Sequence, residues 1–181
     1  MNNNESAYTM NANVNGHVRI WEYCPEHGFG RLLFDRPNKI TREGSSIAAR
    51  ALAGQQSAGI THMYVGYDSN HAQTETVGDS IASFGPHIAL PLAYSPGFGA
   101  TDSNYASNIV YFTAYLTGFD AGRVSSLANG DTIYSLGLVN RTYLINGQGS
   151  QDSLFSRKVV LPSVTYNHSL AITWGITFTS I

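Results

Sequence analysis

A strict alternation of large and small side chains at residues 170–179, LAITWGITFT, restricts the fold of this chain more than any other feature. One side of the segment carries only large apolar residues, and the other carries only alanine, glycine and threonine. The large residues are Leu170, Ile172, Trp174, Ile176 and Phe178, and the small ones are Ala171, Thr173, Gly175, Thr177 and Thr179. Because successive side chains of a β-strand point to opposite faces, this period of two predicts a strand with one face buried in a core and the other wet or lightly covered.

Other segments with a similar pattern recur along the chain, separated by turn sequences. They are HVRIWEY (17–23), GFGRLLFDRPNKIT (28–41, interrupted at Pro37), THMYVGYD (61–68), SNIVYFTAYLTG (107–118), DTIYSLGLVN (131–140) and LFSRKVVLPSVTY (154–166). Strands spaced about 8 to 14 residues apart, with Asn-Gly turns at 129–130 and 146–147, are typical of an antiparallel sheet. The pattern therefore predicts a mainly β fold, an antiparallel β-sandwich of the jelly-roll or immunoglobulin-like (Ig-like) type.

One segment, TREGSSIAARALAG at 41–54, follows a helical period instead. Its apolar residues at 47, 48, 51 and 52 share one face of a helix. Thr41 or Ser45 is suited to cap the start, and Gly54 is suited to end it. We therefore expect one short α-helix near residues 42–53, packed across an end or a face of the sandwich.

The chain is expected to form one domain. Residues 1–16 are rich in asparagine and lack any period, which predicts a flexible or partner-ordered N-terminal arm. Residues 17–181 are expected to form the single β-sandwich domain, with a long loop excursion at 69–106 that is rich in Ser, Gly, Asn, Pro and Thr. A loop of that length in a compact domain usually carries function or contacts a neighbour.

Composition argues against several classes of function. Charged residues make up 12% of the chain and the net charge is −2, so there is no basic stripe to neutralise nucleic-acid phosphates. No segment approaches the roughly 18 apolar residues of a membrane span. Phosphate-loop, dinucleotide-binding and calcium-loop patterns are lacking, which predicts no cofactor. The single cysteine, Cys24, rules out a disulfide within the chain.

Two short segments contain residue types used in catalysis. Cys24-Pro-Glu-His27 suggests a metal site or a thiol nucleophile, but no second Cys/His pair has suitable spacing, so a turn between two strands is the favoured interpretation. Gly78-Asp79-Ser80 with His87 resembles part of a hydrolase site without a visible oxyanion donor. We predict no catalytic or metal-binding residue. The aspartates at 68, 79, 102 and 131 are interpreted as turn residues. Replacing Cys24, His27, Asp79 or Ser80 with alanine should change stability by under about 1 kcal/mol.

Aromatic residues gather around the long excursion and the strand after it. The interface hypothesis names Tyr94, Phe98, Tyr105, Tyr111 and Tyr115. One interpretation is a second aromatic layer of the same sandwich. The other is a tyrosine-rich contact surface for another chain or a glycan, since tyrosine provides a large contact area at a low entropy cost.

Several segments, taken in order, resemble a family of small tailed-bacteriophage virion proteins. The family pattern has an Asn-x-(Val/Ile)-Thr-x-x-Gly opening into a helix, a strand ending in Val-Gly, a Leu-Gly-Leu strand, a Leu-Phe-(Ala/Ser)-Arg strand and a final Leu-x-Ile-x-Trp-x-Ile-x-Phe strand. Here these segments are 38–44, 60–66, 136–138, 154–157 and 170–178. The resemblance implies a non-enzymatic structural component of a phage particle, without catalytic residues.

The function expected from sequence is therefore an oligomeric virion component of the tail, neck or baseplate, or a capsid decoration protein. It would be assembled in the host cytoplasm, and its partners would be copies of itself and other virion proteins. The alternative is a receptor- or glycan-binding β-sandwich module of a phage fibre, with tyrosine and tryptophan side chains as the binding platform for a host-surface glycan or receptor.

Overall fold

A computed structural model describes residues 12–24, 26–55, 59–95, 109–116, 131–143, 149–165 and 169–180. The described strands are β1 (Ala12–Cys24), β2 (Gly28–Ile40), β3 (His62–Gly66), β4 (His87–Pro91), β5 (Ala93–Ser95), β6 (Ile109–Leu116), β7 (Thr132–Tyr143), β8 (Ser150–Thr165) and β9 (Leu170–Ser180). The described helices are α1 (Arg42–Leu52) and the short 3-10 helices η2 (Ser69–His71) and η3 (Ile81–Phe84). None of them is long and apolar enough to cross a membrane.

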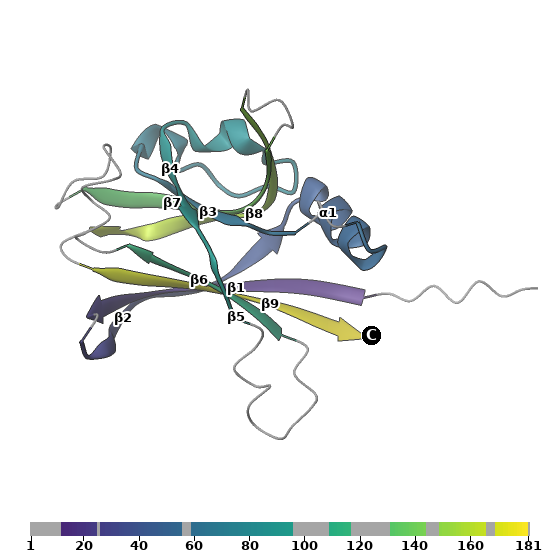
Figure 1. Ribbon diagram of the computed structural model, residues 1–181. Helices are drawn as coiled ribbons and strands as arrows, with labels where there is room; N and C mark the ends of the chain where they lie inside the picture. Colours follow the sequence, from purple (N-terminus) through teal and green to yellow (C-terminus); the bar gives the residue numbers. More distant parts are fainter. Residues whose placement is uncertain are drawn as a thin grey trace, which may run out of the picture.

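The strands form a single antiparallel sheet in the order β4-β3-β7-β8-β2-β1-β9-β6-β5 (Figure 1). Only Leu92 separates β4 from β5, so one run of chain supplies both ends of the sheet and nearly closes it into a barrel. The prediction of a mainly β, antiparallel fold is confirmed. The finer prediction of a sandwich, jelly-roll or Ig-like, is not confirmed.

The barrel has two halves that are joined loosely between β2 and β8. One half contains β2, β1, β9, β6 and β5, and the other contains β8, β7, β3 and β4. The described pairs between β2 and β8 are only Lys39 with Arg157 and Ile40 with Ser156. The strand β2 itself continues through Pro37, which pairs with His17 of β1. The predicted interruption at Pro37 is wrong. Proline lacks a backbone N–H, but Pro37 lies before the residues of β2 that pair with β8, so no hydrogen bond to β8 is lost there.

The alternation of β9 is confirmed as the pattern of a core strand. Its large side chains at 170, 172, 174 and 176 are buried inside the barrel, while Phe178 is half-buried. The strand lies between β1 and β6, so that Trp174 is opposite Val18 on one side and Phe112 on the other. The indole Nε1 donates to Oδ1 of Asn38 at 3.0 Å, which satisfies its polar atom inside the core.

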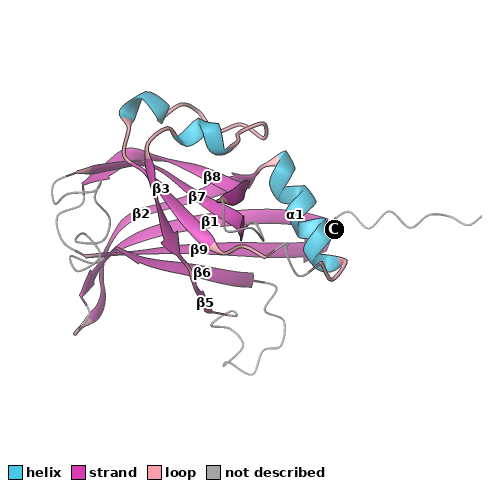
Figure 2. Cartoon of the chain, turned by 45° about the horizontal axis from the view of Figure 1, so that its top comes forward, coloured by secondary structure: helices cyan, strands magenta, loops and turns pink. Residues whose placement is uncertain are grey.

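The predicted helix is confirmed as α1, which lies against one end of the barrel (Figure 2). Thr41 caps it, because its hydroxyl accepts from the backbone N–H of Gly44 at 2.9 Å and donates to the carbonyl of Leu154 at 2.6 Å. Gly54 follows the helix with a φ of +78°. Ile47 is buried, as the helical pattern predicts, but Leu52 is exposed.

The chain between β3 and β4, residues 67–86, is called the cover here. It contains η2 and η3 and packs over the outer surface of β3, β7 and β8 (Figure 2). Phe84 is its buried anchor, with its ring edge-to-face against Tyr64 at 5.9 Å. Much of the predicted excursion is therefore a layer of the fold, followed by β4 and β5.

The boundary of the N-terminal arm also differs from the prediction. Strand β1 begins at Ala12, and residues 12–16 pair with β9. The predicted arm of residues 1–16 therefore includes part of the sheet, and residues 1–11 lie outside the described residues.

Candidate interaction surface

The half of the barrel opposite the cover carries an aromatic surface on its outer side. We call it the aromatic face and define it by Trp21 and Tyr23 of β1, Phe29 of β2, and Tyr111 and Tyr115 of β6. Tyr23 lies 4.8 Å from Tyr115 and 5.9 Å from Phe29 between ring centroids, and Trp21 lies 6.0 Å from Phe29. The rings of Trp21, Phe29, Tyr23 and Tyr115 thus form one connected cluster, with Phe29 and Tyr115 exposed to solvent. Among the described elements, none packs over this face.

Small residues of β9 form the floor of a groove across the aromatic face. Thr173 and Gly175 point outward here because the large residues of β9 point inward. The ring of Tyr111 lies over Gly175, where an added Cβ would come 3.0 Å from the ring. A groove of about 390 Å³ is lined by Arg19, Trp21, Phe29, Tyr111, Thr113, Tyr115 and Thr173. A second hollow, of about 180 Å³, shares Arg19, Tyr111 and Thr173 with it, so the two are continuous.

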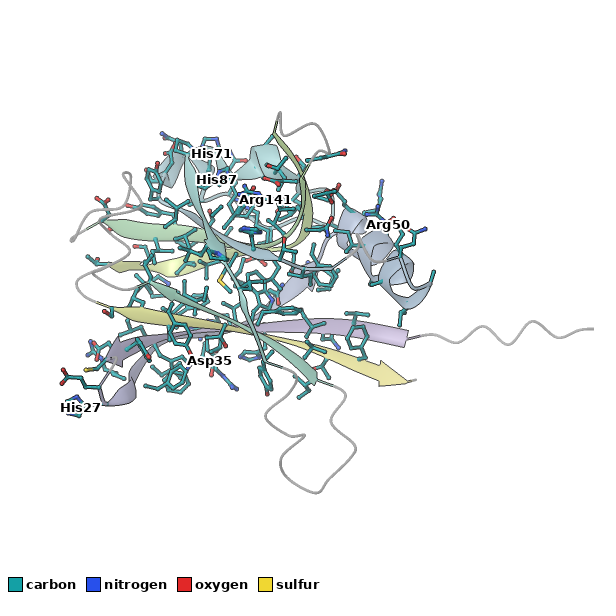
Figure 3. The ribbon with its side chains drawn as sticks, in the orientation of Figure 1. His27, Asp35, Arg50, His71, His87 and Arg141 are labelled. Carbon is teal, nitrogen blue, oxygen red and sulfur yellow. The ribbon has the colours of Figure 1, made fainter. Side chains whose placement is uncertain are left out.

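A small charged network borders the groove. The Asp35 carboxylate accepts hydrogen bonds from Nε2 of His17 and from Nε of Arg19, the latter at 3.3 Å. The hydrogen bond with His17 is the main cause that lowers the pKa of Asp35, and Arg19 lowers it further. Asp35 is labelled on the lower side of the molecule in Figure 3. The network holds Arg19 at the border of a groove that Trp21, Tyr111 and Tyr115 also line, and arginine and aromatic residues are enriched in protein interfaces.

The structure brings together some of the aromatic residues named from sequence. Tyr111 and Tyr115 belong to the aromatic face, whereas Tyr94 lies in β5, in register with Phe112. Phe98 and Tyr105 lie outside the described residues. The other three aromatic residues of the face were not predicted from the sequence. Trp21 and Tyr23 could have been predicted to face outward, because both alternate with the inward-facing Val18 and Ile20 of the same strand.

The segment from Cys24 to His27 is a hairpin turn, as favoured from sequence. The backbone N–H of His27 donates to the carbonyl of Cys24 at 3.2 Å, and the turn joins β1 to β2. Figure 3 shows His27 at the tip of this hairpin. Across the described residues, no three His, Cys, Asp or Glu side chains are grouped to hold a metal ion. Cys24 Sγ lies 3.3 Å from Nδ1 of His27, and this hydrogen bond lowers the pKa of the thiol.

Cys24 is therefore expected to react with iodoacetamide at a lower pH than free cysteine, whose pKa is about 8.5. A lowered pKa means that the thiolate forms earlier as the pH rises. Replacing His27 with alanine should shift the alkylation profile to higher pH, measured by mass spectrometry of the intact protein. Identical profiles for the two proteins would show that His27 does not affect the thiol.

The Asp79, Ser80 and His87 side chains do not form a catalytic triad. His87 donates from Nδ1 to the carbonyl of Gly85 at 2.7 Å, and its ring stacks on Tyr64 at 4.1 Å. The backbone N–H of Ser80 donates to Oγ of Ser83, which is a local turn contact. Figure 3 shows His71, His87 and Arg141 on the side of the molecule that bears the cover. Each group has a structural partner of its own.

Asp79 was interpreted as a turn residue, and the structure gives it a further role. It does accept from Thr76 within the turn, but its Oδ2 also accepts from Nη1 of Arg157 at 3.0 Å. Arg157 is only 3% exposed, and its Nη2 donates to the carbonyl of His71. The guanidinium lies 5.6 Å from the ring centroid of Phe84. The interpretation of Asp79 as a turn residue alone is therefore wrong, and we expect its replacement to lower the stability of the fold.

Taken together, these observations describe a nearly closed antiparallel barrel with one half covered by its own chain and an aromatic face on the other half. Comparisons of the chain with protein-family models, with curated proteins and with solved structures find no match.

Proposed function

We propose that this protein is a non-enzymatic structural component of a tailed-phage virion, which assembles with copies of itself and other virion proteins through the aromatic face. Its place would be the tail, neck or baseplate, or the capsid surface as a decoration protein. The observation that carries the assembly role is the cluster of Trp21, Tyr23, Phe29 and Tyr115 on a sheet surface over which none of the described elements packs. The virion assignment is supported by the sequence resemblance.

The contrast between the two halves of the barrel supports this proposal. On one half, Tyr64 and the other outward apolar residues are buried beneath the cover. On the other half, Phe29 and Tyr115 remain in contact with solvent. Tyrosine, tryptophan and arginine are enriched in protein interfaces, and buried aromatic anchors provide most of the binding energy there. A partner chain would give the aromatic face the burial that the cover gives the other half.

The test is a double substitution, Tyr111→Ala with Tyr115→Ala, in the phage that encodes the chain. Truncating aromatic anchors typically costs about 2 kcal/mol or more of binding energy each, so incorporation into particles should fall by at least about tenfold. The melting temperature of the isolated variant should change little, since Tyr111 and Tyr115 lie outside the core.

The matched control is Val77→Ala, which truncates an exposed apolar side chain of the cover. Quantitative mass spectrometry of purified particles measures incorporation of both variants. Normal incorporation of the double variant would contradict the assembly role of the aromatic face. Absence of the unmodified protein from particles would contradict the virion assignment itself.

A second candidate function is a receptor- or glycan-binding module, and the groove over β9 is the observation that favours it. Its aromatic walls and the hydroxyl groups of Thr113 and Thr173 suit a sugar, which has apolar C–H faces and many hydroxyls. A glycan array separates the two functions. Tight binding of a defined oligosaccharide that is lost in Tyr111→Ala, with normal particle incorporation, would favour the binding module.

A further inference from the structure

The two halves of the barrel leave an open seam between β2 and β8. The seam is defined here by residues 28–38 of β2 and 158–165 of β8. In the described part of the chain, residues of β2 before Lys39 pair with β1 alone. In β8, residues 158, 159, 164 and 165 pair with β7 alone, and residues 160–163 are in register with no described strand. The backbone N–H of Val159 donates to Oε1 of Glu75 at 2.8 Å, so the open edge of β8 begins after Val159. Among the described strands, each of the two therefore presents one edge of backbone N–H and C=O groups without a neighbour. Edges of this kind are ready templates for another strand.

The seam is hollow along its length. A hollow of about 790 Å³ is lined by the β1–β2 hairpin, including residues 27–31, and on the other side by residues 163–165 of β8. A second hollow, of about 240 Å³, is lined by residues 32–36 of β2 and by Pro162 of β8. Since both strands line both hollows, the two edges face a shared space.

Apolar side chains are exposed along this seam. Of the six large apolar side chains exposed in the described residues, three belong to its edges. Phe29 is 51% exposed, Leu32 is 39% exposed and Leu161 is 59% exposed. Soluble β proteins usually protect an open edge with charges, proline or bulges. Pro37 and Pro162 restrict this seam, and Arg31, Asp35 and Arg36 place charges along β2, but the stretch from 28 to 36 contains no proline and keeps Phe29 and Leu32 exposed.

We propose that the seam receives an extended segment of a partner polypeptide, which adds as a strand between β2 and β8. A row of alternating N–H and C=O groups is matched by another peptide backbone, and apolar side chains at alternate positions of the segment would contact Phe29, Leu32 and Leu161. The seam is bounded on both sides by strands of the same chain. A strand within the folded barrel of a second copy carries its own neighbours and does not fit there, whereas an arm or linker of a partner does.

The inference deepens the proposed function and rests on it, because it names a second attachment site, which adjoins the aromatic face and shares Phe29 with it. Its test uses only the isolated protein and decapeptides selected from a displayed random library. We expect selected peptides with alternating apolar residues that bind with a micromolar Kd and slow the hydrogen exchange of β2 amides at 28–36 at least tenfold. N-methylation of alternate peptide amides should abolish binding, because it removes the backbone donors.

Two edge variants, Leu32→Lys and Leu161→Lys, should each weaken peptide binding at least tenfold, with melting temperatures close to that of the unmodified protein. Leu52→Lys, at an exposed apolar position on α1, is the matched control and should bind normally. Failure to select any peptide, binding without protection of β2, or an equal loss in Leu52→Lys would overturn the proposal. The proposal would also be overturned if, without peptide, the protection of β2 amides from hydrogen exchange rose with protein concentration. That result would assign the seam to a second copy of the chain. These outcomes leave the particle test of Tyr111 and Tyr115 unaffected, so the two proposals can fail separately.

Discussion

Replacing Trp174 with alanine is expected to lower the free energy of unfolding by about 3–5 kcal/mol, the usual cost of removing a large aromatic side chain from a core. Trp174 is fully buried at the centre of β9, where the two neighbouring strands supply Val18 and Phe112 as its opposite residues. The substitution also leaves Oδ1 of Asn38 without the indole donor. Urea unfolding followed by circular dichroism measures the effect. Since a domain of this size has about 5–15 kcal/mol of stability, a large share of the total would be lost.

Thr173→Ala is the matched control for this prediction, because Thr173 is the neighbouring residue on the outer side of β9 and is only half-buried. It should change the free energy of unfolding by under about 1 kcal/mol. Deleting residues 170–181 removes the strand from between β1 and β6, and should leave insoluble protein. A soluble truncated protein that melts cooperatively, or a Trp174→Ala variant as stable as Thr173→Ala, would show that β9 is not essential to the core.

Asp79→Ala is expected to lower the free energy of unfolding by a comparable amount, about 3–5 kcal/mol. Removing one partner of a buried ion pair leaves the charge of the other partner uncompensated. Arg157 would lose its carboxylate partner beneath the cover, and its Nε already has no hydrogen-bond partner. Thermal and urea unfolding should both report the loss. Limited proteolysis should cut within residues 67–86 more rapidly, because the pair ties the cover to β8.

Asp68→Ala provides the control, because Asp68 accepts from the backbone N–H of Asn70 in a turn on the same cover but contacts no buried cation. It should cost under about 1 kcal/mol. The double variant Asp79→Leu with Arg157→Met should be more stable than Asp79→Ala, because it removes the unpaired charge as well as the pair. Equal stability of Asp79→Ala and Asp68→Ala would show that the ion pair is not a significant source of stability.

Local features of the fold were predictable because they depend on residues close together in the chain. The alternation of β9 gave the correct buried face, since the period of a strand is written directly in its side chains. The helix was equally local, with Thr41 at its start and Gly54 after its end. The turn at Cys24 to His27 followed from the same reasoning.

Features that depend on distant pairing could not be read from the sequence. The near-closure of the barrel results from β4 and β5 pairing with different strands on either side of Leu92, and no local pattern specifies this. The partner of Arg157 likewise lies in the cover, far from β8 in sequence. Turn-like sequence around Asp79 concealed its second partner, because aspartate is favoured in turns for its own backbone hydrogen bonds. The aromatic face was found only in part, since its residues come from three strands.

The pairing of β1 with β9 has a consequence for how the chain folds during synthesis. Ala12 pairs with Ser180, so the first described strand acquires one of its two neighbours only after the last described strand has been made. At about 5–20 residues per second, the ribosome leaves β1 without that neighbour for roughly 10–30 s. The β1–β2 hairpin must stay soluble through this interval with a hydrophobic side uncovered. Completion of the barrel therefore waits until β9 has been made, and rapid overproduction should favour aggregation of the nascent chain.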